Sequence, residues 1–213
     1  MAIYSTSEKT RQALVNAAGE LAAELGFASV STRAIATRAG ENIGSIHYHF
    51  GGKQKLFEAV VAAVTVRWQN EPLDQVLADC DLTSRAGQAQ AVALTLRRMA
   101  RLLFDRTAPD WHCRVIYQLL QLPNPLQEAF REGVFEPDSR LIEKLLKRIA
   151  PGLSDKQVQI HFFVLMSPLI LHADYQKALF RRMDITEYDE EYLHDLIDVC
   201  IRQALLLYGL PVE

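Results

Sequence analysis

Residues 31–57 read STRAIATRAGENIGSIHYHFGGKQKLF, and this stretch decides the fold. Ser31 or Thr32 can cap a helix of about eight residues that ends at a glycine. After a turn of a few residues, Asn42 can cap a second, very short helix that runs to His49. Two short helices joined by a glycine-containing turn are typical of a helix-turn-helix motif.

The two helices divide their residues between an inner and an outer face. Apolar side chains at helical spacing face inward: Ala34, Ile35, Ala39, Ile46 and Phe50. Small or polar residues of the second helix face outward: Gly44, Ser45, His47 and Tyr48. Small residues let a helix approach a groove, and hydroxyl or imidazole groups can donate to phosphates or base edges. The pattern therefore predicts a DNA-contacting surface.

Two other interpretations of the HYHF tetrad at 47–50 stay open at this point. The tetrad can be a surface aromatic cluster on a small helical core. Alternatively, His47 and His49 can bind a metal ion, although residues two apart on a helix point to different faces and make a poor ligand pair. Spacing alone does not decide between these interpretations and DNA binding.

A longer helix precedes the motif. Ser5 and Glu8 have the spacing of a capping box, so we expect the helix to begin at Ser5 and to end at Gly26. Its apolar stripe consists of Leu14, Ala17, Ala18, Leu21 and Leu25. Lys53 begins a fourth helix, and the free N–H groups at the helix starts near Thr32, Asn42 and Lys53 can bind phosphate.

The distribution of charge along the chain differs between its N-terminal segment and the remainder. The net charge of −3 is not that of a typical nucleic-acid binder. However, residues 1–55 hold six basic and four acidic side chains, whereas the remainder holds 17 basic and 22 acidic side chains. We therefore expect a DNA-binding domain over residues 1–55 and a separate body over residues 56–213.

The quoted stretch resembles the DNA-binding domain of the TetR family of transcriptional regulators. The matching features are a polar cap, Ile-Ala, Ala-Gly, an aromatic-His-Phe ending and a Lys-x-x-Leu pair, here at Thr32, 35–36, 39–40, 48–50 and 53–56. The same stretch of sequence is also similar to that of the CecR-like subgroup of this family. Two positions depart from the family pattern, which usually has Val-Ser where this chain has Glu41-Asn42, and Tyr where it has His47.

The resemblance implies a set of DNA contacts. Thr32 and Arg33 would contact phosphate, and Arg33 is the best candidate to read a guanine because guanidinium matches its O6 and N7. A solvated surface charge is the alternative for Arg33. The remaining expected contacts, to groove, bases or phosphates, are Asn42, Ile43, Gly44, Ser45, His47, Tyr48, His49 and Lys53.

The body reads as further helices without any strand pattern, so the predicted fold class is all-α. Prolines separate the segments because the residue before a proline disfavours helix. We expect helices near 56–70, 73–80, 85–106, 111–121, 124–133, 137–149, 155–183 and 189–208.

The last two of these helices predict a homodimer. The segment 160–171 is apolar nearly all round, and the last helix has a wide apolar stripe over 193–207. One chain of this size hardly offers enough partners for both, and pairing with a second copy would supply them. The TetR resemblance implies the same arrangement; the alternative is a core formed within one chain.

The resemblance also implies a small-molecule effector bound among the middle helices of the body. Aromatic or sulfur-containing candidates at helical spacing are Trp111, Cys113, Tyr117, Phe130, Phe163 and Met166. Polar candidates that could orient an effector are Arg114, Gln118 and His161. An ordinary hydrophobic core is the alternative for the first group.

Other classes of protein fit poorly. Three separated cysteines without a CxxC pair argue against a disulfide framework, and neither a signal peptide nor a membrane span is evident, so we expect a cytoplasmic protein. His161 and His172 lie about 16 Å apart along one helix, too far to share a metal. We expect no enzyme activity, cofactor or metal, but a ligand-responsive repressor that binds a near-palindromic double-stranded DNA operator. The alternative is a regulator of the same scaffold controlled by a protein partner.

Overall fold

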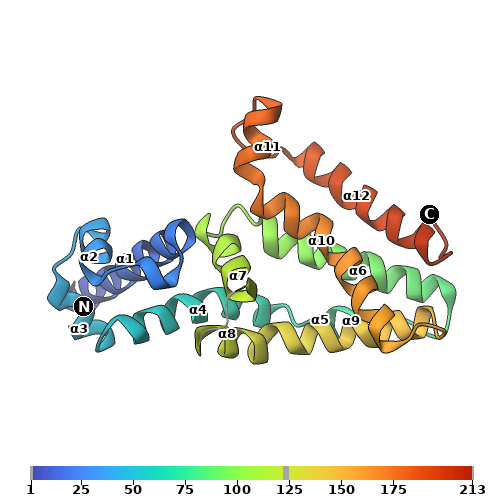
Figure 1. Ribbon diagram of the computed structural model, residues 1–213, viewed down its shortest axis with the longest axis horizontal. Helices are drawn as coiled ribbons and strands as arrows, with labels where there is room; N and C mark the ends of the chain where they lie inside the picture. Colours follow the sequence, from blue (N-terminus) through green and yellow to red (C-terminus); the bar gives the residue numbers. More distant parts are fainter. Residues whose placement is uncertain (1, 122–124, 213) are drawn as a thin grey trace. The chain divides into compact units, whose positions relative to one another are not determined.

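The computed structural model describes residues 2–121 and 125–212, and these are helical with no strand among them (Figure 1). The all-α prediction is confirmed. The α-helices are α1 (Ala2–Leu25), α2 (Thr32–Ala39), α3 (Ile43–Phe50), α4 (Lys53–Asn70), α5 (Leu73–Val76), α6 (Arg85–Phe104), α7 (Trp111–Gln121), α8 (Pro125–Phe130), α9 (Glu136–Ile149), α10 (Asp155–Asp174), α11 (Gln176–Met183) and α12 (Glu190–Leu207).

The chain packs as two compact units. Unit 1 combines residues 1–67 with 106–133, and unit 2 combines residues 68–105 with 134–213. Helix α4 begins in unit 1 and contributes its last turn to unit 2. Each unit has its own apolar core.

Unit 1 is built around α1, which packs against α2, α3 and α7. Its core includes the fully buried Leu14, Ile35, Ile46 and Leu56, one from each of the first four helices. Phe27, in a short 3-10 turn after α1, lies edge-on to Phe57 with ring centroids 5.1 Å apart. Burial of these side chains joins the predicted helix-turn-helix to α1 and α4.

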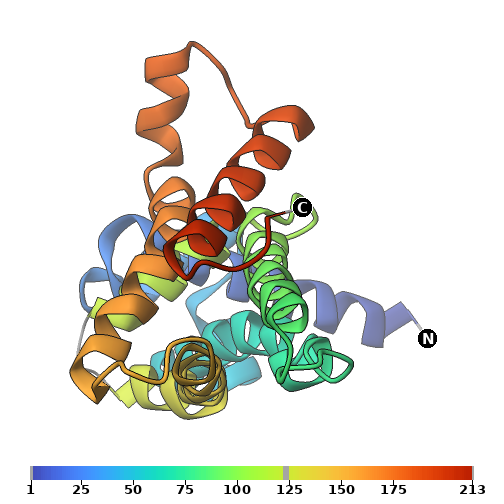
Figure 2. The same ribbon diagram turned by 90° about the vertical axis from the view of Figure 1, so that its right-hand side faces the viewer.

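Unit 2 is built around α6, which packs against α5, α9, α10 and α12. Arg85, at the start of α6, donates to the carbonyl oxygens of Ile149 at 3.2 Å, Tyr208 at 2.5 Å and Gly209 at 3.0 Å. It thus satisfies carbonyls at the ends of α9 and α12, which would otherwise lack partners. Figure 2 shows α11 projecting from the pair that α10 and α12 form.

Several predicted helix limits are wrong. The first helix begins at Ala2 and not at Ser5, so Ser5 lies inside the helix and is not its N-cap. The helix predicted from 155 to 183 is two helices, since the chain turns at Tyr175 between α10 and α11. No residue of α11 is buried, so apolar packing contributes little to holding it in line with α10.

The predicted break at Pro137 is also wrong. After α8 the chain passes through a π-helical segment, Arg131–Phe135, directly into α9. Pro137 falls in the first turn of α9, where a missing backbone N–H costs little. The fifth helix is shorter than predicted, ending at Val76. Residue 124, the predicted start of α8, lies outside the described residues.

Candidate nucleic-acid interface

Local capping builds the helix-turn-helix as its sequence predicts. Ser31 caps α2, since its side chain accepts from the N–H of Ala34 at 3.1 Å, and Gly40 ends α2 in the left-handed conformation with φ 68°. The Asn42 side chain accepts from the N–H of Gly44 at 2.8 Å and starts α3. Of the two predicted caps for α2, Ser31 is therefore the one used.

The division of α3 into two faces is confirmed. Ile46 and Phe50 are buried, whereas the opposite face leaves Ile43, Gly44 and His47 exposed. Ser45 and His49 are half-buried. Tyr48 is 83% exposed, and its ring lies edge-on to that of His49 at 5.0 Å. The ring contact with His49 leaves most of the Tyr48 side chain exposed, so this side chain is accessible to a binding partner.

The two arginines of α2 have different environments. Arg38 pairs with Glu20 and Glu24 of α1, each at 3.1 Å, and the hydrogen bonds that it donates to the carboxylates of Glu24 and Glu20 raise its pKa. Arg38 thus forms ion pairs that link α2 to α1. Arg33 is exposed, and no carboxylate of the described residues pairs with it. Arg33 is therefore the guanidinium of α2 that is available to a partner, next to the half-buried Thr32.

Lys53 begins α4 after a glycine pair that reverses the chain. Gly51 and Gly52 both have positive φ, 73° and 145°, which suits residues without a Cβ. The Lys53 Nζ lies over the Phe57 ring, 5.4 Å from its centroid. This contact packs the half-buried lysine against Phe57, one turn further along its own helix.

Six of the nine predicted effector residues lie in unit 1. Trp111 is buried, and its ring occupies the space over Gly19 of α1, where an added Cβ would come within 2.4 Å of the ring. Within the described part of the chain, Trp111 Nε1 and Gln118 Oε1 are buried without a hydrogen-bond partner. Of the others, Phe130 is buried, Cys113 and Tyr117 are half-buried, and Arg114 is exposed.

The other three predicted effector residues, all on α10, lie in unit 2. Met166 is buried in the core, and Phe163 is 56% exposed. The His161 Nδ1 lies 3.1 Å from the Tyr208 hydroxyl at the end of α12. Burial raises the pKa of Tyr208 to about 12. The three side chains therefore point to different surroundings within this unit.

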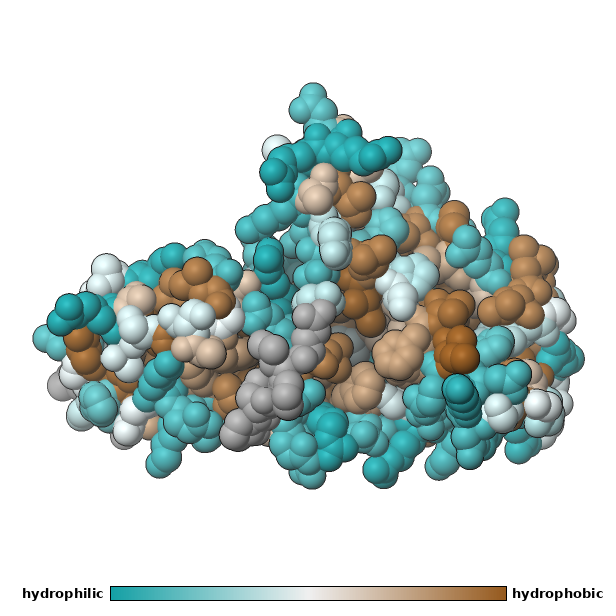
Figure 3. Space-filling view, in the orientation of Figure 1, coloured by the Kyte–Doolittle hydropathy of each residue, from teal (hydrophilic) through white to brown (hydrophobic). Residues whose placement is uncertain are grey.

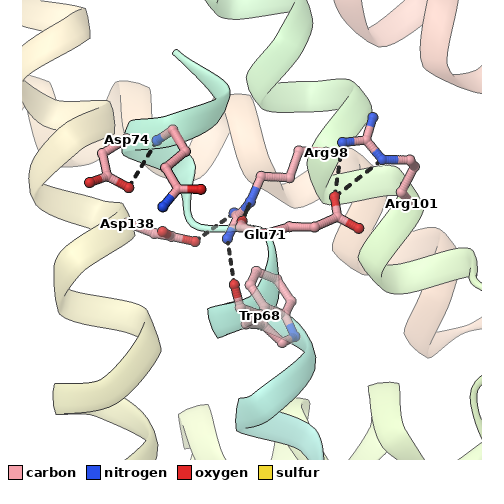
Figure 4. Close-up of polar contacts among 7 residues, drawn as sticks. Trp68, Glu71, Asp74, Arg98, Arg101 and Asp138 are labelled. Atoms are coloured by element: carbon pink, nitrogen blue, oxygen red, sulfur yellow. Dashed lines mark hydrogen bonds and ion pairs between the residues drawn. The ribbon is translucent and has the colours of Figure 1, made fainter. Parts of the chain in front are cut away.

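A buried arginine that sequence reasoning does not single out holds the last turn of α4 within unit 2 (Figure 4). Arg98 of α6 is 2% exposed and donates to the carbonyl oxygens of Trp68, at 3.2 Å, and Glu71. Its guanidinium lies 5.5 Å from the centroid of the Trp68 ring and pairs with Asp138 of α9. A cation at the carboxyl end of a helix also interacts favourably with its dipole.

Two further findings bear on the class of protein. Among the described residues, no three His, Cys, Asp or Glu side chains are grouped so that they could hold a metal ion. None of the helices in the described ranges is long and apolar enough to cross a membrane.

Comparison with solved structures supports the fold. The chain is similar to AibR in complex with isovaleryl coenzyme A and operator DNA, with 10% identity, 91% of this chain and 97% of that chain covered, and a TM-score of 0.65. HlyIIR, a hemolysin II transcriptional regulator, gives 14% identity, coverage of 91% and 97%, and a TM-score of 0.62. A TetR-like transcriptional regulator from Rhodococcus sp. RHA1 is 19% identical, with 92% of this chain and 96% of that chain covered and a TM-score of 0.56.

Family models match two separate ranges that together make up most of the chain. A comparison with curated protein sequences returns no match. Residues 14–60 match the model for bacterial regulatory proteins of the tetR family. Residues 89–210, more than half of the chain, match the C-terminal domain of the HTH-type transcriptional dual regulator CecR. The chain therefore belongs to the TetR family of DNA-binding transcriptional regulators, with a C-terminal domain of the CecR type.

Proposed function

We propose that the chain is a ligand-responsive repressor that binds a near-palindromic operator as a homodimer and leaves it when a small, largely apolar effector binds. Residues 1–55 would bind DNA, and residues 56–213 would bind the effector and a second copy. The observation that carries the proposal is the face of α3 on which Gly44, His47 and Tyr48 are exposed, opposite the buried Ile46 and Phe50.

The DNA contacts proposed for this face follow from its chemistry. The groove would receive Ile43, Gly44 and Ser45, and the side chains of His47, Tyr48 and His49 would contact phosphates or bases. Arg33 would read a guanine, and the ammonium of Lys53 would bind a phosphate. Phosphate contacts supply most of the affinity, so binding should fall steeply with salt.

The homodimer is proposed through the outer faces of α10 and α12 in unit 2. The exposed apolar residues there are Ile160, Phe163, Val164 and Leu171 of α10, and Val199, Leu206 and Leu207 of α12. Figure 3 shows apolar side chains gathered along α10. An apolar surface of this kind on two neighbouring helices is typical of a protein interface.

The effector is proposed to act through the spacing of the two recognition helices. An effector that binds the dimer more tightly in one spacing than in another shifts the equilibrium toward that spacing and weakens operator binding. The AibR complex, with isovaleryl coenzyme A and operator DNA, supports a small molecule with an apolar acyl group as one class of effector.

The experiment that tests this proposal is a gel shift with DNA from upstream of the gene that encodes the chain. The wild-type chain should shift this DNA, and Arg33→Ala should weaken binding about 5- to 150-fold per bound chain at physiological salt, since a good bidentate base contact contributes about 1–3 kcal/mol. Arg106→Ala, outside the proposed interface, is the control. Unchanged affinity in Arg33→Ala would show that the contact assignment is wrong.

A further inference from the structure

The turn between α2 and α3 carries an acidic side chain beside the proposed DNA surface. Glu41 directly precedes Asn42, the cap of α3. A carboxylate at this place is unfavourable for a DNA-binding protein, because phosphates would repel it. A free carboxylate beside the start of α3 would also be attracted to the helix N-terminus, which is where a phosphate would bind.

The structure shows where the Glu41 carboxylate lies. Its Oε1 accepts a hydrogen bond from the Thr10 hydroxyl of α1 at 2.9 Å, across 31 residues of sequence. Both side chains are half-buried. Helix α1 packs on the inner side of the motif, where Ile46 and Phe50 are buried. The hydrogen bond therefore draws the carboxylate toward α1 and away from the exposed face of α3.

A second contact fixes this part of α1 against α3. The guanidinium of Arg11, next to Thr10, lies over the ring of Phe50 at 5.4 Å from its centroid. Phe50 is the last residue of α3, so α1 contacts the segment both before the helix and at its end. The Thr10 hydroxyl is therefore held in a defined place relative to the turn.

We propose that Thr10 is a positioning residue of the DNA interface, whose hydroxyl holds the Glu41 carboxylate away from the phosphates of the duplex. This inference rests on the proposed function, because it requires a duplex on α3. The role of Thr10 exists only while residue 41 is charged. If the hydrogen bond between α1 and the turn had only a structural role, its loss would instead lower the stability of the fold. The effect of that loss on DNA affinity would then not depend on the salt concentration.

The test is a double-mutant cycle on a duplex that the wild-type chain selects from a random-sequence pool, measured by fluorescence anisotropy. Thr10→Val should weaken binding about fourfold per bound chain, the effect of two like charges about 5 Å apart in water. Glu41→Gln in the Thr10→Val background should restore the DNA affinity that Thr10→Val loses. Thr10→Ser should bind as wild type. Thr65→Val is the matched control, because the Thr65 hydroxyl donates only to its own helix.

Salt and stability separate this role from a structural one. The loss in Thr10→Val should shrink as salt is raised to about 0.5 M, since the repulsion is screened, while thermal unfolding confirms that each variant is folded. An equal loss from Thr10→Val with and without the Glu41→Gln substitution, or unchanged affinity, would overturn the role of Thr10 while leaving DNA binding intact. A wild-type chain that selects no duplex would overturn the proposed function, and this inference with it.

Discussion

Arg98 Nη1 lies 2.6 Å from Asp138 Oδ2, and this buried pair joins α6 to α9 beside the last turn of α4. Burial raises the pKa of Asp138, while the charge of Arg98 and its hydrogen bond act in the opposite direction. Because Arg98 also holds the carbonyls of Trp68 and Glu71, the pair fixes the end of the helix that begins at Lys53.

Arg98→Met should destabilise the chain by about 3–5 kcal/mol at neutral pH, since it leaves a carboxylate buried without its partner. Without Arg98, the pKa of Asp138 in the folded protein rises further above its unfolded value. A carboxyl with a raised pKa adds stability while protonated and loses it as pH rises through the folded pKa. The deficit of the variant against wild type should therefore grow as pH rises above the wild-type pKa of Asp138, which itself lies above the ordinary value of about 4.

Urea unfolding at a series of pH values measures this deficit. Arg101→Met is the control, because its pair with Glu71 is exposed and such pairs contribute about 1 kcal/mol or less. A deficit in Arg98→Met that is independent of pH would contradict the described environment of Asp138.

Gly19→Ala should destabilise unit 1, because the new Cβ would come within 2.6 Å of three atoms of the Trp111 ring. Overpacking of this kind costs about 1–3 kcal/mol, which exceeds the gain of about 1 kcal/mol from the better helix propensity of alanine. Gly152→Ala is the matched control, since an added Cβ there meets nothing within 4 Å. Equilibrium unfolding followed by tryptophan fluorescence would show the difference; a more stable Gly19→Ala would contradict the packing of Trp111 on α1.

Val164→Asp and Leu206→Asp should each convert the proposed dimer to a monomer, because both side chains are exposed in the single chain and a charge there would be buried in the dimer. Sedimentation velocity measures the change. Val66→Asp, at an exposed apolar position of α4 that the proposal leaves outside the interface, should remain a dimer. A wild-type chain that sediments as a monomer at micromolar concentration would remove the basis for this interface.

Lys53→Gln should lower operator affinity and flatten its salt dependence. The slope of log K against log salt falls by about 0.9 for each phosphate contact that is lost. Lys177→Gln on α11 removes the same charge outside the proposed interface and should leave the slope as in wild type. An equal slope in the Lys53 variant would mean that its ammonium does not bind a phosphate.

The helix-turn-helix could be predicted from sequence because its signals are local. Ser31 and Asn42 accept from backbone N–H groups two or three residues later, and Gly40 and Gly51 end their helices with positive φ. These interactions are complete within each short helix, so no tertiary contact is needed to interpret them.

Features that depend on distant residues could not be predicted. Pro137 signals a break on its own, yet the π-helical turn before it lets α9 follow without one. Nothing around Arg98 in the sequence shows that it is buried, since its partners lie 27 to 40 residues away. The hydrogen bond between Thr10 and Glu41 could not be predicted from sequence either, because only the packing of α1 brings the two residues together.

The most direct test of the central claim is a hydroxyl-radical footprint on DNA from upstream of the gene. Two copies of α3 in successive major grooves should protect two patches of backbone about one helical turn apart, related by the near-palindrome. Tyr48→Ala, which removes a side chain that is 83% exposed, should weaken the protection of both patches together. A single patch, or no protection at protein concentrations where the chain is folded, would contradict the account.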